Sequence, residues 1–454
     1  MTHDPISNPS DWPKAGPIDL ERHDRPHASA SLEWWYVNAH LETNEGTPYA
    51  VFAAFFRSLR KAEHAADEPS HFHALTYRLV NLETREAVTC SLLEDTVMAE
   101  MRHRLATARD MPFMKRALLE QLDLGQIPAP DRLLKTRPTL PMDRLALDMD
   151  GQRFEKLADG RYRLDLSEAA RDFRLVLDFK LEIPVVRHGD DGVVRGVGAE
   201  EMFYYFCPRC EVHGTLGSNG EYELRGKGWY DHEFGSVPEA RRNEAEQAKV
   251  GWNWIAAQLD TGWQISAYDL FDLRSSEKSV GHWLIAIDPD GKHHALSEFS
   301  LTPEAFWMST RTFTRWPTRW RLQIPALELN LVAEARVPSD EFQTLLAPPA
   351  FWEGRVDLTG TQGNSALAGR GYVERNGLGV QTDIGGFLSD VGKETREQLR
   401  ALLSVEPNEA NAVRLVSRAG YAQPLDAQDL ARLGGTLVAP VRHVVELGGK
   451  AWRS

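Results

Sequence analysis

The sequence is poor in cysteine and in long apolar runs. Its three cysteines among 454 residues are an odd set that provides no disulfide framework, which favours a reducing compartment. No stretch approaches the roughly 20 apolar residues of a membrane-spanning helix, and the N-terminus lacks the basic and apolar regions of an export signal. We therefore expect a cytoplasmic protein that does not span a membrane.

Positive charge is scarce relative to negative charge. The 52 Lys and Arg residues face 66 Asp and Glu residues, for a net charge of −14. This balance repels a phosphate backbone, so nucleic acid is not expected as a partner. The sequence also contains no P-loop, no Gly-x-Gly-x-x-Gly fingerprint and no Gly-x-Ser-x-Gly elbow. Nucleotide chemistry and serine hydrolysis are disfavoured, and no cofactor is expected.

Metal-binding patterns are incomplete. Cys207 and Cys210 form a lone Cys-x-x-Cys, and the remaining cysteine, Cys90, is distant in sequence. Zinc ribbons require a second pair, so two buried thiols on a strand are the better interpretation. His71 and His73 share one face of a predicted strand, but no third ligand is visible. No metal site is therefore predicted.

Aromatic residues are abundant and gather in segments typical of β-strands. The chain has 13 Trp, 18 Phe and 11 Tyr. Residues 33–57 have the pattern of a hairpin of two aromatic and β-branched strands, and residues 251–270 have the same pattern. The second hairpin aligns with the first at a constant offset of 218 residues (Trp252 minus Trp34) over ten positions.

A second repeated motif closes each half of the chain. Gly-Lys-Gly-Trp-Tyr-Asp at 226–231 is matched by Gly-Arg-Gly-Tyr-Val-Glu at 369–374, which aligns Asp231 with Glu374. Two repeated motifs in the same order predict two copies of one domain. The short alternating segments between them favour closed antiparallel sheets.

The domain limits follow from these markers. We predict a first barrel over residues 1–240, with a helical insertion near 99–123 that lies across it as a lid. A second barrel is predicted over 241–388. Residues 392–454 have a 3.6-residue apolar period and form a predicted short all-α segment.

Five segments resemble a known family: EWWYVNAHLE, FYYFCPRCEVHGTL, GKGWYDHEFG, GWNWIAAQLDTG and FWEG with GRGYVE. In this order they are similar to the hydroxyneurosporene synthase (carotenoid hydratase) family of double lipocalin-like proteins. The resemblance implies a mainly β fold of two tandem lipocalin-like antiparallel barrels. It implies less about the reaction, because proteins of this shape include hydratases, cyclases and pericyclic enzymes.

The C-terminal segment VRHVVELGGKAWRS is similar to the early Gly-Gly-Lys-x-x-Arg motif of trans-isoprenyl diphosphate synthases. In that family the Lys and Arg bind a diphosphate, which assigns Lys450 and Arg453 to an incomplete diphosphate site here. The resemblance implies fusion to a prenyl synthase domain in the full-length polypeptide, with magnesium relevant only if the rest of that domain is present. It indicates a hydrophobic isoprenoid as the ligand.

Hydration or cyclisation of an isoprene unit without a cofactor begins with protonation of an alkene. The acid must lie in a dry environment that keeps it protonated, and aromatic faces stabilise the resulting carbocation. In GKGWYDHEFG, strand alternation places Trp229, Asp231 and Glu233 on one face and His232 on the other. We favour Asp231 over His232 as the acid because Glu374 repeats the carboxyl group.

Other roles stay open for these groups. Asp231 and Glu374 can instead be structural acids that accept hydrogen bonds where each barrel closes. Glu33 is a candidate second acid or general base, and pairing with an arginine such as Arg57 is an equal alternative. The candidate substrate contacts, which serve equally well as core residues, are Trp35, Tyr36, Tyr204, Trp229, Trp252, Trp254, Tyr268 and Tyr372.

The preferred hypothesis is a cofactor-independent terpenoid hydratase or cyclase that protonates an isoprenoid chain and quenches the carbocation. A non-catalytic protein that binds an isoprenoid or another lipophile needs the aromatic residues but not the acids. A pericyclic enzyme that works by shape is the third class, and its acid variants retain most of their rate.

Overall fold

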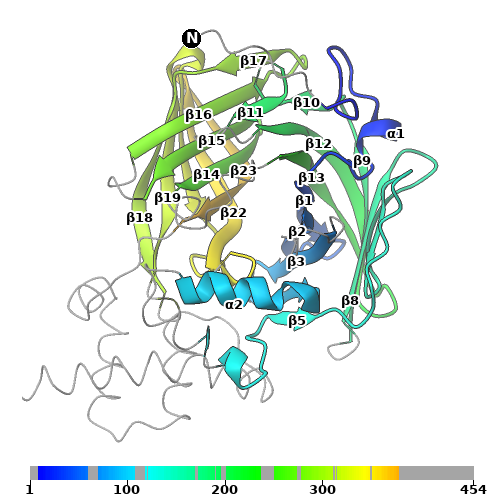
Figure 1. The fold of residues 1–454 in the computed structure, drawn as a ribbon. Helices are drawn as coiled ribbons and strands as arrows, with labels where there is room; N and C mark the ends of the chain where they lie inside the picture. Colours follow the sequence, from blue (N-terminus) through cyan, green and yellow to red (C-terminus); the bar gives the residue numbers. More distant parts are fainter. Residues whose placement is uncertain are drawn as a thin grey trace, which may run out of the picture.

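The computed structural model describes residues 9–59, 70–107, 118–119, 121–168, 172–189, 191–195, 201–236, 250–273, 278–309, 312, 314–347 and 350–377. This part of the chain is mainly β-structure, arranged as two curled sheets (Figure 1). The predicted fold of two tandem lipocalin-like barrels is confirmed. The predicted helical segment 392–454, with Lys450 and Arg453, lies outside the described residues.

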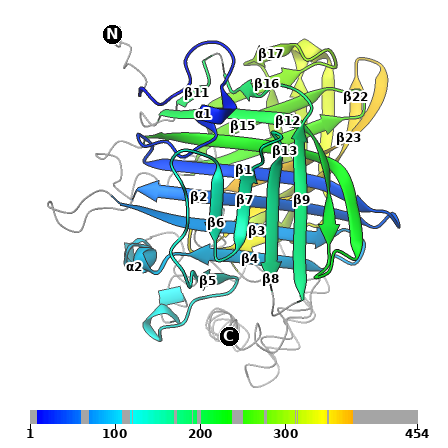
Figure 2. The ribbon, with the colours of Figure 1, turned by 90° about the vertical axis from the view of Figure 1, so that its right-hand side faces the viewer.

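The first sheet has the strand order β5-β4-β3-β2-β1-β13-β12-β9-β8-β7-β6, with β10 and β11 paired to β12. Its strands are β1 (Leu32–Thr43), β2 (Pro48–Leu59), β3 (His71–Asn81), β4 (Ala87–Leu93), β5 (Asp131–Leu133), β6 (Ala146–Met149), β7 (Gln152–Lys156), β8 (Tyr162–Glu168), β9 (Phe173–Leu181), β10 (Val186–Arg187), β11 (Val193–Arg195), β12 (Glu201–Leu216) and β13 (Tyr222–Ser236). Strands β8 and β9 cross in front of β1–β4 (Figure 2), so the sheet folds over on itself.

The second sheet has the order β17-β16-β15-β14-β23-β22-β20-β19-β18, with β21 paired to β22. Its strands are β14 (Val250–Leu259), β15 (Gln264–Asp272), β16 (Lys278–Ile287), β17 (His293–Leu296), β18 (Ser300–Met308), β19 (Arg315–Ile324), β20 (Leu329–Ala335), β21 (Glu341–Gln343), β22 (Ala350–Gln362) and β23 (Ser365–Asn376). Among the described strands every pair is antiparallel except β4 with β5, which is parallel.

Helices are few in the described residues. Two short 3-10 turns, η1 (Asp95–Val97) and η4 (Pro325–Leu327), accompany α1 (Leu20–His23) and α2 (Met98–Thr107). Helix α2 begins where the helical insertion is predicted, and residues 108–117 lie outside the description. Its Met101 and Leu105 pack in one cluster with Phe72 of β3 and with Leu345, which comes from the second half of the chain. Among the described residues, no helix is long and apolar enough to cross a membrane.

The strands pair in the same register in both halves, in agreement with the repeat in the sequence. In β1 and β13, Tyr36 lies opposite Asp231, and in β14 and β23, Trp254 lies opposite Glu374. The glycines of the repeated motif have the same structural reason in both halves. A Cβ added at Gly226 would lie 1.9 Å from the carbonyl oxygen of His40 in β1, and one at Gly369 would lie 2.5 Å from that of Gln258, the equivalent residue in β14. Close backbone approach therefore requires glycine in both copies.

Alternate residues of β1 and β13 pack in two different hydrophobic cores. Trp35 and Tyr230 belong to the cluster inside the first barrel. Tyr36 and Trp229 belong to a cluster between the two sheets, which we call the inter-sheet core. Its aromatic members are Tyr36, Phe52, Tyr204, Phe206, Trp229, Trp254, Phe342, Phe351 and Tyr372. A third cluster fills the second barrel. The central strands of the first sheet are thus covered on both faces.

Candidate active site

Strand alternation divides the polar residues of β1 and β13 into two groups. Asp231 and Glu233 lie on the inter-sheet face, in register with Tyr36 and Trp34. Glu33 and His232 point the other way, into the first barrel. Because both faces of these strands are buried, each group lies in its own low-polarity surroundings.

Four carboxyl groups gather on the inter-sheet side, and we call them the carboxyl cluster. Asp231 and Glu233 come from β13, Glu353 from β22 and Glu374 from β23. Glu353 and Glu374 lie directly opposite each other in their strand pair. The two sheets meet at Trp254 of β14, whose ring lies edge-on to Trp229, with centroids 5.9 Å apart. Both copies of the repeated motif therefore contribute an acid to one site.

Neutral donors form hydrogen bonds with three of these carboxyl groups. Asp231 accepts hydrogen bonds from Trp229 Nε1 at 2.5 Å and from the Tyr204 hydroxyl at 3.1 Å. Trp252 Nε1 donates to Glu374 at 3.1 Å. The Tyr36 hydroxyl donates to Glu353. Within the described part of the chain, none of the four forms an ion pair, although buried carboxylates normally have a cationic partner.

The absence of cations among these described neighbours determines the protonation of the cluster. Burial raises the pKa of Asp231 well above its usual value, and the nearby Glu374 carboxyl raises it further. The pKa values of Glu233 and Glu353 are raised for the same two reasons, burial first and neighbouring carboxyls second. Burial raises the pKa of Glu374 to about 7. Together these shifts favour the protonated carboxylic acid form in the cluster over the carboxylate form.

Exposure differs across the cluster. Asp231 and Glu353 are buried, whereas Glu374 and its neighbours Trp252 and Tyr268 are partly exposed. The accessible side of the cluster is therefore the side of β14, β15 and β23, and Asp231 lies at the inner end.

Aromatic rings surround the inner end. The ring of Phe206 is stacked on that of Trp229 with centroids 5.0 Å apart, and the Tyr36 ring lies edge-on to Trp254 at 5.6 Å. Indole and phenol faces attract cations because their π-systems are negative at the centre. These rings are candidates to stabilise a positive charge that develops near Asp231.

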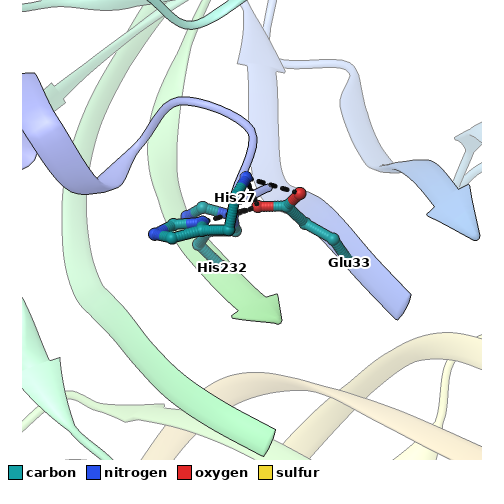
Figure 3. Close-up of side chains that lie close together, drawn as sticks. All are labelled: His27, Glu33 and His232. Carbon is teal, nitrogen blue, oxygen red and sulfur yellow. Dashed lines mark hydrogen bonds and ion pairs between the residues drawn. The ribbon is translucent and has the colours of Figure 1, made fainter. Parts of the chain in front are cut away.

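The second polar group lies inside the first barrel (Figure 3). Glu33 Oε1 lies 2.8 Å from His27 Nδ1 and 3.1 Å from His232 Nε2, and Oε2 lies 3.3 Å from Arg57 Nη1. Burial alone would raise the pKa of Glu33, but the hydrogen bonds from the two histidines outweigh it and lower the pKa to about 2. Glu33 is thus a carboxylate and a poor proton donor. The ion pair with Arg57 is the alternative that the sequence left open.

Hydrogen bonds to Asp24, in the same barrel, hold the segment that carries α1. The Asp24 carboxylate accepts hydrogen bonds at 2.5 to 2.8 Å from the hydroxyls of Tyr162, Tyr205 and Tyr230. Trp35 Nε1 donates to the Asp24 carbonyl oxygen at 2.7 Å. Trp35, a candidate substrate contact from the sequence, therefore lies on the opposite face from Asp231 and takes part in these hydrogen bonds. There the Trp35 ring packs in the cluster inside the first barrel.

One atom from each of His27, Glu33 and His232 lies within 4.8 Å of the others, as in a metal site. Two observations favour an ion-pair cluster instead. Arg57 already neutralises Glu33, and its guanidinium would repel a divalent cation. Structural zinc also requires a fourth ligand, and none of the described residues supplies one.

The remaining candidates from the sequence lie apart from the carboxyl cluster. His71 contacts Arg57, and His73 pairs with Glu94 at 2.5 Å, so the two histidines do not share a ligand. The cysteines at 90, 207 and 210 are buried and free. Glu353 was not among the site residues predicted from the sequence, although it lies in the FWEG segment of the family resemblance. His27 was not predicted either, because it lies in a segment without a strand pattern.

A family model described as AttH-like matches residues 13–378. A solved structure described as an AttH, from Nitrosomonas europaea, is similar over 81% of this chain and 99% of its own, with 22% identity and a TM-score of 0.60. Kievitone hydratase from Nectria haematococca is similar over 80% of this chain and 94% of its own, with 14% identity and a TM-score of 0.56. At these identities the likeness shows the fold. A comparison with curated proteins found no match.

Proposed function

Because this chain belongs to the AttH-like family, we propose that it is a cofactor-independent hydratase or cyclase that protonates an alkene. One observation carries the proposal: the Asp231 carboxyl is buried between the sheets, without an ion pair to any described residue, and its pKa is raised. A neutral carboxylic acid in a dry, aromatic environment is the group that can protonate an unactivated double bond. The specific relation to hydroxyneurosporene synthases stays a prediction.

The surrounding residues have defined roles in this mechanism. Asp231 transfers its proton to one alkene carbon and becomes a carboxylate, while the other carbon becomes a cation. Trp229 Nε1 and the Tyr204 hydroxyl already point at the two carboxylate oxygens, so they stabilise the negative charge without reorganisation. We assign stabilisation of the cation to the aromatic rings of the inter-sheet core, among them Trp254. Water or a second double bond then attacks, and the Asp231 carboxylate takes up the proton that is released.

We propose an isoprenoid as the substrate. The walls around Asp231 are aromatic, and the C-terminal motif with Lys450 and Arg453 resembles an enzyme that makes prenyl chains. A covalent prenyl synthase partner would supply such a chain directly. Kievitone hydratase, which shares the fold, is named for a hydration, and hydration is one of the two outcomes proposed here.

Deuterium incorporation tests the proposal. The protein is incubated with geraniol, farnesol and geranylgeraniol in heavy water, and the products are analysed by mass spectrometry. We expect one deuterium on carbon in each product, because the acid exchanges its proton with solvent. A product without deuterium on carbon would support a pericyclic enzyme instead. Binding without any product would support a carrier.

A further inference from the structure

A buried histidine whose ring has no hydrogen-bond partner among the described residues lies near the proposed acid. His188 follows β10, and its backbone N–H donates to the carbonyl oxygen of Tyr204 in β12 at 2.9 Å. The imidazole is stacked on the Tyr204 ring, with centroids 4.9 Å apart and an interplanar angle of 10°. The hydroxyl of Tyr204 in turn donates to Asp231. His188 is therefore separated from Asp231 by a single ring on the inter-sheet side.

The His188 ring is fully buried, at 0% exposure, yet neither Nδ1 nor Nε2 has a hydrogen-bond partner among the described residues. This contrasts with the equally buried His232, whose two ring nitrogens contact Tyr205 and Glu33. Proteins pair the great majority of their buried polar groups, so an unpaired imidazole in a candidate site requires an explanation.

The protonation of His188 limits what it can bind. Burial lowers the pKa of the imidazole to about 3, so the ring is neutral near pH 7. A neutral imidazole has one N–H donor and one acceptor nitrogen. A hydroxyl group, which both donates and accepts, satisfies such a ring, and a carbonyl oxygen satisfies its donor. A hydrocarbon satisfies neither.

We propose that His188 is a specificity-determining residue that binds a hydroxyl or carbonyl oxygen carried by the apolar substrate. The site then selects an oxygenated isoprenoid over a pure hydrocarbon. This inference rests on the proposed function only in taking the carboxyl cluster as the ligand site. A site built to hydrogen-bond a substrate oxygen rejects the analogue that lacks it, because its own polar group is then left unpaired.

Matched ligands test this proposal through binding affinity instead of reaction rate. Dissociation constants for farnesol and for farnesene, its hydrocarbon counterpart, are measured from the fluorescence of the site tryptophans. We expect the wild type to bind farnesol about 10-fold more tightly, the equivalent of one hydrogen bond. His188→Phe keeps the stack on Tyr204 but should lose this preference, while its affinity for farnesene changes less than about threefold. His188→Gln should restore part of it.

His213→Phe is the matched control, because His213 lies on β12 with 63% of its side chain exposed. Its preference for farnesol should equal that of the wild type. Farnesene binding reports an intact site in every variant. An unchanged preference in His188→Phe, or no preference in the wild type, would overturn the proposal. Because only binding is measured, failure here is distinguishable from failure of the proton-transfer mechanism, which deuterium incorporation reports.

Discussion

Asp231→Asn is expected to lower the rate of product formation from farnesol at least about 100-fold, the lower end of what a general acid contributes. Asparagine has the shape of aspartic acid and can still accept the hydrogen bond from Trp229 Nε1. It has no acidic proton to transfer. The farnesol dissociation constant should therefore change little, and the loss should appear in kcat. Initial rates and fluorescence titrations on the same preparation separate the two quantities.

The pH profile gives the same mechanism a second test. Burial and neighbouring acids raise the pKa of Asp231, so the active form is the protonated form. The wild-type rate should be constant at low pH and fall as the pH rises through the pKa of this acid. Asp290→Asn, in an exposed turn, is the control and should behave as the wild type. If Asp231→Asn kept half of the wild-type rate, catalysis by protonation would be wrong and a pericyclic mechanism favoured.

Glu33→Gln is expected to lower the free energy of unfolding by roughly 3 kcal/mol at pH 7, with little effect on kcat. The folded-state pKa of Glu33 is about 2, compared with an ordinary value of 4.5. A lowered pKa stabilises the fold wherever the carboxylate is ionised in both states, and a difference of about 2.5 pKa units corresponds to roughly 3 kcal/mol. The variant also leaves Arg57 buried without its partner, which adds to the loss.

The dependence of this loss on pH has a definite sign. The contribution of Glu33 is fully present above pH 4.5 and disappears as the pH falls toward 2. Urea unfolding should therefore show a large difference between wild type and variant at pH 7 and a smaller one at pH 3. Glu45→Gln, in an exposed turn, should show no difference at either pH. A loss of kcat as large as that of Asp231→Asn would show that the barrel interior takes part in the chemistry.

The sequence predicts the arrangement of the repeated strands well. Period-2 alternation in β13 is a local property, so it places Asp231 and His232 on opposite faces without knowledge of the fold. The repeat predicts that Glu374 occupies the same register as Asp231, and the strand pairs confirm this register.

Other parts of the site depend on contacts between distant segments. Glu353 joins the cluster only because β22 pairs with β23, which no local pattern encodes. His27 enters the first barrel on a segment that has no periodic pattern, so its pairing with Glu33 was not predictable. His188 stacks on Tyr204 through a two-strand pairing across β10 and β12.

The pKa values of Glu33 and Asp231 shift in opposite directions because the two acids have different neighbours. Both are buried acids in adjacent strands. Glu33 has two imidazoles and a guanidinium around it, so its pKa is lowered. Among the described residues Asp231 has neutral donors and other acids but no cation, so burial raises its pKa. Residue type alone cannot distinguish a structural carboxylate from a proton donor.

The central claim is that Asp231 is a protonated carboxylic acid at neutral pH. The infrared difference spectrum between wild type and Asp231→Asn at pH 7 tests it most directly. We expect a carbonyl stretch of a protonated carboxyl group that is present in the wild type, absent in the variant and shifted in heavy water. A difference spectrum with only the bands of an ionised carboxylate would contradict the account, because Asp231 would then have no proton to give.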